Sequence, residues 1–212
     1  MKLSYSRIKC FKDCKYKYYL KYILKEKGTQ NFAHLTKGKR VHSLLEYHGS
    51  QSDVTDPIAI SIYERFRDSE IGKDILSPKS LREYKINMDS ELNPKNESSD
   101  FVGYIDRINF KNDKFELIDF KTGKYPEKQD FSQLMYYGVW FLQRFPESQN
   151  VKLRYVYVEH LNEHSAIFDR KNLELIKTSF LSDIKSIENC EDFTKNPTPL
   201  CNWCEFCDLC KF

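Results

Sequence analysis

The sequence predicts an α/β protein in which helices flank a mixed central sheet. Segments 101–110 and 115–121 read as strands, and the polar turn signal at 111–114 between them predicts a β-hairpin. Segments with helical spacing of apolar residues lie before and after this hairpin. The chain has 212 residues, of which 40% are hydrophobic, so we expect one domain with a sizeable core. No run approaches the ~18 apolar residues of a membrane helix, so no membrane association is expected.

The remaining elements follow from apolar spacing and chain breakers. A helix is expected from Ser4 or Ser6, either of which can cap it, to about residue 25, because Lys27-Gly28-Thr29 breaks the pattern. The other expected elements, in chain order, are helices at 38–47 and about 57–75, a loop at 77–80, a strand at 83–88, a polar loop at 89–100, the hairpin, a helix at 130–143, strands at 151–159 and 165–169, and a helix at 171–189.

The hairpin is expected to bring two carboxylates and a lysine together. A turn centred between Asn112 and Asp113 pairs residues whose numbers sum to 225, whether the loop has two or four residues. Asp106 then lies opposite Asp119, with Cβ atoms about 5 Å apart, and alternation places Lys121 on the same face. A shared proton or a bound cation relieves repulsion between such close carboxylates, and oxygen ligands favour Mg²⁺ or Mn²⁺. The alternative is an exposed hairpin with solvated charges.

Basic residues are concentrated between Arg7 and Arg40. This segment holds eleven Lys or Arg residues and two acids, a net charge of +9, whereas the whole chain carries +3. The tyrosines interleaved with these residues are Tyr5, Tyr16, Tyr18, Tyr19 and Tyr22. Cations neutralise phosphates and aromatic rings stack on unpaired bases, so the segment suits single-stranded nucleic acid. The alternative is a solvated helix with a buried tyrosine stripe.

The C-terminal tail carries four of the seven cysteines at C-x2-C-x2-C-x2-C spacing. They are Cys201, Cys204, Cys207 and Cys210. Because the first residues lack an apolar signal region, we expect a cytoplasmic protein in which these thiols bind metal and do not form disulfides. Four local thiolates could bind Zn²⁺, although this spacing is cramped for a closed tetrahedral site. Alternatively, three of them join a distant cysteine around a [4Fe–4S] cluster.

Five short motifs occur in order along the chain. They are Ser4-Tyr5-Ser6-Arg7-Ile8 with Cys14 and Tyr18, Gly38-Lys39-Arg40-Val41-His42, Gly103-Tyr104-Ile105-Asp106, Asp119-Phe120-Lys121-Thr122-Gly123, and Gln133-Leu134-Met135-Tyr136-Tyr137. Together they resemble the signature of RecB-like nucleases of the PD-(D/E)XK superfamily, in the branch that carries an iron–sulfur cluster. The resemblance spans nearly the whole chain and implies a restriction-endonuclease-like core.

The resemblance assigns roles to individual residues. The implied ligands of Mg²⁺ or Mn²⁺ are His42, Asp106, Asp119 and the backbone carbonyl of Phe120. Lys121 corresponds to the catalytic lysine. Gln133 and Tyr137, one helical turn apart, are expected to position the DNA strand or the lysine. Glu83 falls where relatives often have a glutamate, and a surface strand acid is an equal interpretation.

The resemblance also implies a set of cluster ligands. The family pattern is one N-terminal cysteine followed by C-x2-C-x5-C, which Cys14, Cys201, Cys204 and Cys210 match. Cys207 is an extra residue within the last gap, and Cys10 lies one helical turn before Cys14. The sequence leaves open whether Cys10 or Cys207 replaces one of the four ligands. Cys190 is expected to be a small core residue.

The implied function is metal-dependent hydrolysis of DNA phosphodiester bonds, as an exonuclease on single-stranded ends. Residues 1–212 would form one domain, with a helical DNA-contacting part at 1–50, a nuclease core at 80–170 and a cluster tail at 197–212. The length is similar to CRISPR-associated exonucleases that trim prespacers and to phage recombination nucleases, which implies CRISPR adaptation or recombination proteins as partners. The alternative is a catalytically silent iron–sulfur or zinc module that binds DNA or protein. Digestion polarity and the choice between DNA and RNA stay open.

Overall fold

Five strands form one mixed sheet in the order of the sequence. The computed structural model describes residues 3–29, 33–47, 52–76, 79–97, 99–111 and 114–210. The elements are α1 (Tyr5–Asp13), α2 (Lys15–Tyr18), the π-helix η1 (Tyr19–Ile23), α3 (Ala33–Tyr47), α4 (Pro57–Asp68), α5 (Glu70–Ile75), β1 (Ser80–Met88), β2 (Phe101–Lys111), β3 (Lys114–Lys121), α6 (Ser132–Arg144), β4 (Asn150–Tyr157), β5 (Asn162–Asp169), η2 (Arg170–Asn172), α7 (Leu173–Glu188), η3 (Pro199–Trp203) and α8 (Cys207–Cys210). Strands β3 and β4 are parallel and the other neighbours are antiparallel, so the predicted mixed α/β architecture is confirmed.

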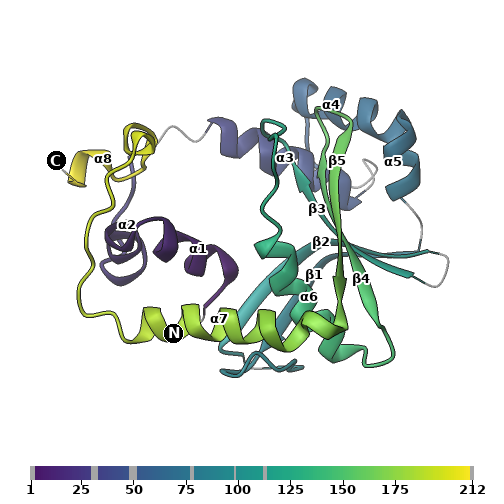
Figure 1. Ribbon diagram of the computed structural model, residues 1–212. Helices are drawn as coiled ribbons and strands as arrows, with labels where there is room; N and C mark the ends of the chain where they lie inside the picture. Colours follow the sequence, from purple (N-terminus) through teal and green to yellow (C-terminus); the bar gives the residue numbers. More distant parts are fainter. Residues whose placement is uncertain are drawn as a thin grey trace.

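Helices cover both faces of the sheet (Figure 1). One face packs on α6 and α7 through a core that includes Leu117, Leu134, Phe141, Leu153 and Phe180. The other face packs on α3, α4 and α5 through a core that includes Val41, Phe66, Ile75, Ile118 and Val156. Helix α6 connects the parallel strands β3 and β4, as a parallel pair requires. Among the described helices, none is long and apolar enough to cross a membrane.

Two predicted helices are each divided in two. The helix expected to run from the N-terminus to about residue 25 is interrupted at Cys14, where the backbone is extended and Sγ accepts a hydrogen bond from the Lys17 N–H. The helix expected at 57–75 is interrupted at Ser69, whose side chain accepts from the Gly72 N–H and caps α5. In both places a side chain satisfies backbone donors that a continuous helix would have paired, so a new helix begins.

The predicted hairpin register is confirmed where β2 and β3 pair. Their partners run from Lys111 opposite Lys114 to Arg107 opposite Ile118, and each pair sums to 225. The central turn residues, Asn112 and Asp113, lie outside the described residues, as does part of the loop expected at 77–80.

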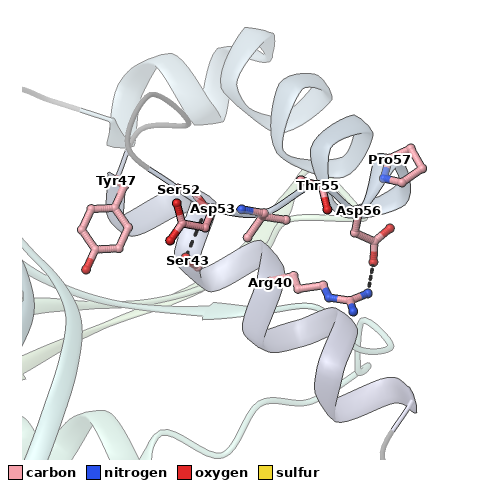
Figure 2. A pocket seen from close by; sticks show the side chains of 9 residues that line it. Arg40, Ser43, Tyr47, Ser52, Asp53, Thr55, Asp56 and Pro57 are labelled. Atoms are coloured by element: carbon pink, nitrogen blue, oxygen red, sulfur yellow. Dashed lines mark hydrogen bonds and ion pairs between the residues drawn. The ribbon is translucent and has the colours of Figure 1, made fainter.

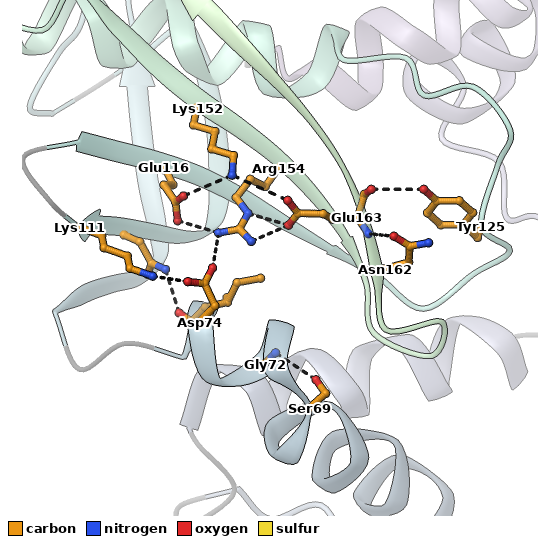
Figure 3. A network of polar contacts seen from close by, with 12 residues as sticks. Ser69, Gly72, Asp74, Lys111, Glu116, Tyr125, Lys152, Arg154, Asn162 and Glu163 are labelled. Carbon is orange, nitrogen blue, oxygen red and sulfur yellow. Dashed lines mark hydrogen bonds and ion pairs between the residues drawn. The ribbon is translucent and has the colours of Figure 1, made fainter.

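A buried arginine links helix α5 to the sheet through ion pairs (Figure 3). The side chain of Arg154 on β4 is 5% exposed and contacts three carboxylates, Asp74 at 3.0 Å, Glu116 at 2.9 Å and Glu163 at 2.6 Å. These carboxylates come from α5, β3 and β5. A cation this deeply buried is tolerated because each of its donors finds a charged partner. The network therefore fixes α5 relative to the strands that lead to the candidate site.

Candidate functional site

The candidate site lies where strands β2 and β3 separate. Their pairing ends at Arg107 and Ile118, and we call the point beyond this pair the fork. On β2, Ile105 and Ile108 both pack in the core beneath α6, although odd and even strand positions ordinarily face opposite sides. The alternation of side chains is therefore interrupted between them. The interruption places Asp106 at the fork.

Strand β1 is distorted at the same level. In the β1–β2 pairing, Arg82 lies opposite Arg107 and Tyr84 lies opposite Ile105. Glu83 and Asp106 occupy the position between these two pairs. Glu83 has φ of 44°, in the left-handed region that non-glycine residues rarely adopt. Such backbone strain is concentrated at functional sites, because the surrounding structure must hold it in place. The distortion turns Glu83 toward the side of the sheet that α3 occupies.

Three side chains from different elements converge at the fork. A ligand atom from each of His42 on α3, Glu83 on β1 and Asp106 on β2 lies within 4.8 Å of the other two. The Nδ1 atom of His42 is 3.5 Å from Oδ2 of Asp106, and that oxygen also accepts a 2.7 Å hydrogen bond from the Phe120 N–H. Gly38 lets α3 approach, since a Cβ there would lie 3.0 Å from Oγ1 of Thr122 at the end of β3.

A second set of side chains extends the site toward α6. Nζ of Lys121 is 2.7 Å from Oδ2 of Asp119, and Gln133 donates a 2.9 Å hydrogen bond to Oδ1 of the same carboxylate. Lys121 also donates to Oε1 of Gln133 at 3.3 Å, and Nε2 of Gln133 is 3.3 Å from the hydroxyl of Tyr137. Oδ2 of Asp119 is buried and lacks a hydrogen bond of good geometry, so the Lys121 ammonium is the charge that balances it.

The electrostatics of the site follow from burial and from like charges. Burial, followed by repulsion from Asp119, raises the pKa of Asp106 well above the usual carboxyl value. Burial, followed by Glu46 and Asp119, raises the pKa of Glu83. Burial lowers the pKa of His42, so its imidazole stays neutral and able to bind a metal. Concentrated acids beside a neutral imidazole form a donor set that fits Mg²⁺ or Mn²⁺.

The sequence predicted most of the residues at the fork, but it did not assign a role to two of them. Glu83 had no definite role, and its position in the compact set became visible only through the strained backbone of β1. Glu46 has no role in the sequence-based prediction, although it lies one helical turn after His42 and its charge acts on Glu83. The spacing of four residues on a helix was the signal that could have identified it.

The cysteines of the tail and the N-terminal helices line a cavity away from the fork. The cavity, of about 580 Å³, lies between α1 and α2 and the tail, and its lining includes Cys14, Cys201, Cys204, Cys207 and Cys210. Burial raises the pKa of Cys210, with further raising contributions from the charges of Cys14, Cys201 and Cys204. Cys10 instead lines a different hollow, and burial raises its pKa to about 11. Cys190 is half-buried against the core beyond the end of α7, in keeping with the expected packing role.

Polar contacts hold the tail against the N-terminal helices. Glu205 lies 2.6 Å from Nζ of Lys21 and 3.5 Å from Nζ of Lys17, and its backbone carbonyl accepts from the Thr29 N–H at 2.9 Å. Asn196 donates a 2.9 Å hydrogen bond to the Asp13 carbonyl. Figure 1 shows the tail lying beside α1 and α2, so residues 183 positions apart in the sequence are neighbours.

Another hollow, of about 790 Å³, lies beside α3 (Figure 2). Two pairs of its polar groups contact each other: Arg40 is 2.5 Å from Asp56, and the hydroxyls of Ser43 and Ser52 are 3.2 Å apart. Asp56 also caps α4 by accepting from the Ile58 N–H. These pairings give the hollow a structural role at the start of α4.

Comparison with known proteins agrees with the geometry of the fork. The profile of the PD-(D/E)XK nuclease superfamily matches residues 2–211. The chain belongs to this superfamily. Membership in the PD-(D/E)XK superfamily indicates a metal-dependent nuclease, with which the set of His42, Glu83 and Asp106 is consistent.

Other comparisons are more distant. No curated protein sequence matches the chain. Among solved structures, one described as "Crystal structure of SSO0001" is 14% identical, with a TM-score of 0.40, and the match covers 84% of this chain and 96% of that one.

Proposed function

We propose that this PD-(D/E)XK protein is a metal-dependent deoxyribonuclease that removes nucleotides from single-stranded DNA ends. The observation that carries the proposal is the fork itself. There, His42, Glu83 and Asp106 form a compact donor set, and the ion pair of buried Asp119 with half-buried Lys121 lies beside it. Action at ends rests on the resemblance to CRISPR-associated and phage exonucleases. Their partner proteins and a cytoplasmic location are proposed on the same ground.

The residues at the fork would divide the work of phosphodiester hydrolysis. The ligands proposed for Mg²⁺ or Mn²⁺ are His42, Glu83, Asp106, Asp119 and the carbonyl of Phe120. When bound, such an ion supplies Lewis acidity and lowers the pKa of water at the site. The remaining steps belong to groups of this chain that hold the substrate and move or stabilise charge.

Lys121 is placed to act directly on the reacting groups. Asp119 and Gln133 hold its ammonium from two sides, so its orientation is fixed before substrate arrives. A preorganised cation stabilises the negative charge that develops on a phosphate in the transition state, and it can also orient the attacking water. Gln133 contacts both Asp119 and Lys121 and is therefore a positioning residue for this pair. The Tyr137 hydroxyl accepts a hydrogen bond from Nε2 of Gln133 and so helps to orient the Gln133 side chain.

We further propose that the tail cavity holds a [4Fe–4S] cluster on Cys14, Cys201, Cys204 and Cys210. Cys14 from the N-terminal segment and the tail cysteines line the same cavity, so a cluster there would be ligated by segments far apart in the sequence. Zinc held by the four tail thiolates alone is the alternative, and their C-x2-C-x2-C-x2-C spacing is cramped for a closed tetrahedral site. The cluster would fasten the tail to the N-terminal helices and so complete the fold.

The function is tested with purified protein on end-labelled linear DNA, single- and double-stranded, with Mn²⁺ or EDTA. We expect Mn²⁺-dependent shortening of the single strand and no reaction in EDTA. Circular single-stranded DNA should resist, because it has no end. Tight DNA binding without cleavage under any metal would favour the catalytically silent module, and equal cleavage of matched RNA would broaden the substrate class.

A further inference from the structure

A groove of about 640 Å³ leads from the catalytic residues to the N-terminal helices. Gln133 and Tyr137 line it at the fork, and Lys9, Lys17 and Lys21 line it on α1, α2 and η1. Lys17 and Lys21 share one carboxylate, Glu205, so positive charge exceeds negative charge around these two lysines. Such a cationic groove suits a phosphate backbone.

One aromatic residue of this groove is half-exposed. The side chain of Tyr104 on β2 is 52% exposed, and its ring has no aromatic neighbour among the described residues. Its backbone is held by pairing with Lys85 on the neighbouring strand β1. Half-exposed aromatic rings on a rigid strand are a surface on which a base can stack.

The position of Tyr104 relative to the fork is fixed by strand geometry. Tyr104 precedes Asp106 by two residues, and two residues of an extended strand span about 7 Å. Its cross-strand partner is Lys85 on β1, and Glu83 lies opposite Asp106 two residues further along the two strands. Lys85 is exposed and has no ion-pair partner among the described residues. An aromatic ring and a free ammonium therefore lie next to the proposed metal ligands on the same pair of strands.

We infer that Tyr104 is a stacking platform for an unpaired DNA base close to the scissile phosphate, and that Lys85 beside it contacts the DNA backbone. The inference rests on the proposed nuclease function and adds the residue that favours a single strand. A base inside a duplex is paired and stacked on its neighbours, so its face is not available to Tyr104. Preference for unpaired DNA would then arise at the fork as well as in the basic N-terminal segment.

The test combines removal of the ring with removal of the base. Single-stranded oligonucleotides carry one abasic site, moved stepwise through the nucleotides around the cut, and kcat/KM is measured for wild type, Tyr104→Ala and Tyr104→Phe. On intact DNA, Tyr104→Ala should lose about 5- to 150-fold, since stacking contributes that much per base, and Tyr104→Phe should stay near wild type. At one position the abasic site should impair wild type but cause no further loss in Tyr104→Ala.

Controls separate this inference from a general effect on folding. Phe110→Ala removes another exposed aromatic of the same strand, 42% exposed and far from the groove lining, and should leave cleavage unchanged. Lys85→Gln should reduce the salt dependence of single-strand binding by about 0.7 in log–log slope. Equal losses for Tyr104→Ala on intact and abasic DNA at every position would overturn the platform. If wild type cleaves no DNA, the proposed function fails, and anisotropy of the same labelled oligonucleotides tests the platform by itself.

Discussion

The backbone N–H of Phe120 donates a 2.7 Å hydrogen bond to Oδ2 of Asp106 across the fork between β3 and β2. In a strand, the N–H and C=O of one residue point to the same neighbour, and those of the next residue point the other way. The Lys121 carbonyl accordingly accepts from Val158 on the β4 side. The Phe120 carbonyl is therefore directed toward Asp106, where the family resemblance places a metal ligand.

Replacing Asp106 with asparagine should stabilise the metal-free protein at neutral pH while abolishing cleavage. Burial and Asp119 raise the pKa of Asp106, so its contribution to stability is fully present below the ordinary carboxyl value near 4 and is lost as pH rises through the elevated folded value. Thermal unfolding in EDTA from pH 4 to pH 8 should show the wild-type Tm falling more steeply than that of Asp106→Asn. A variant with a lower Tm than wild type at pH 8 in EDTA would contradict this account.

Lys121→Ala and Asp119→Ala should abolish turnover without unfolding the protein. Loss of a preorganised charged donor costs roughly 100- to 1000-fold in kcat, and removal of Asp119 also removes a proposed ligand. Single-turnover cleavage in Mn²⁺, with Tm and DNA affinity measured alongside, checks both variants. Lys185→Ala, an exposed lysine on α7, is the matched control. Near-normal turnover of Lys121→Ala would show that its assigned role is wrong.

Glu83→Gln should raise the Mn²⁺ concentration needed for half-maximal activity by about 10- to 100-fold, a range typical of weakened metal sites. The amide retains the shape of the side chain but not its charge, so activity should partly recover at high Mn²⁺. A titration of activity against Mn²⁺ measures the shift. Glu91→Gln, in the exposed segment after β1, should leave the titration unchanged. An unaltered titration for Glu83→Gln would return this residue to a surface strand acid.

Anaerobically purified protein should be brown, and Cys→Ser changes at positions 14, 201, 204 and 210 should bleach it and lower the Tm. A link between Cys14 and Cys201 closes a loop of 187 residues, for which closure entropy gives roughly 5 kcal/mol. Serine variants of Cys10, Cys190 and Cys207 should stay brown. Visible absorbance, iron content and thermal unfolding are the measurements. Brown Cys14→Ser with colourless Cys207→Ser would show that the tail supplies all four ligands.

Neutralising Lys9, Lys17 and Lys21 together should weaken binding to single-stranded DNA of any sequence. Each lost phosphate contact reduces the slope of log affinity against log salt by about 0.7, so the triple glutamine variant should lose about 2. Glutamine is preferred to glutamate because Lys17 and Lys21 contact Glu205, beside which a second acid would be repelled. A triple variant of Lys114, Lys171 and Lys185 serves as control. An unchanged slope would favour the structural interpretation of this segment.

Local patterns were sufficient for much of the fold. The hairpin register follows from one turn signal, because antiparallel pairing is decided by where the chain reverses. Helix and strand locations follow from apolar spacing, although Cys14 and Ser69 end helices that their flanking residues would have continued. Capping competes with helix propagation through single hydrogen bonds, and apolar spacing does not record that competition.

The sequence by itself determined the fold class, the hairpin register, the superfamily and the residue types that meet at the fork. Only the tertiary structure decided that the alternation of β2 breaks at Asp106, that a strained Glu83 joins His42 there, and that Tyr104 remains exposed beside them. The physical reason is the distance along the chain between the residues that interact. Registers and periods arise from neighbours along the chain, whereas a strained backbone and a group of buried carboxylates persist only because several distant elements hold them together.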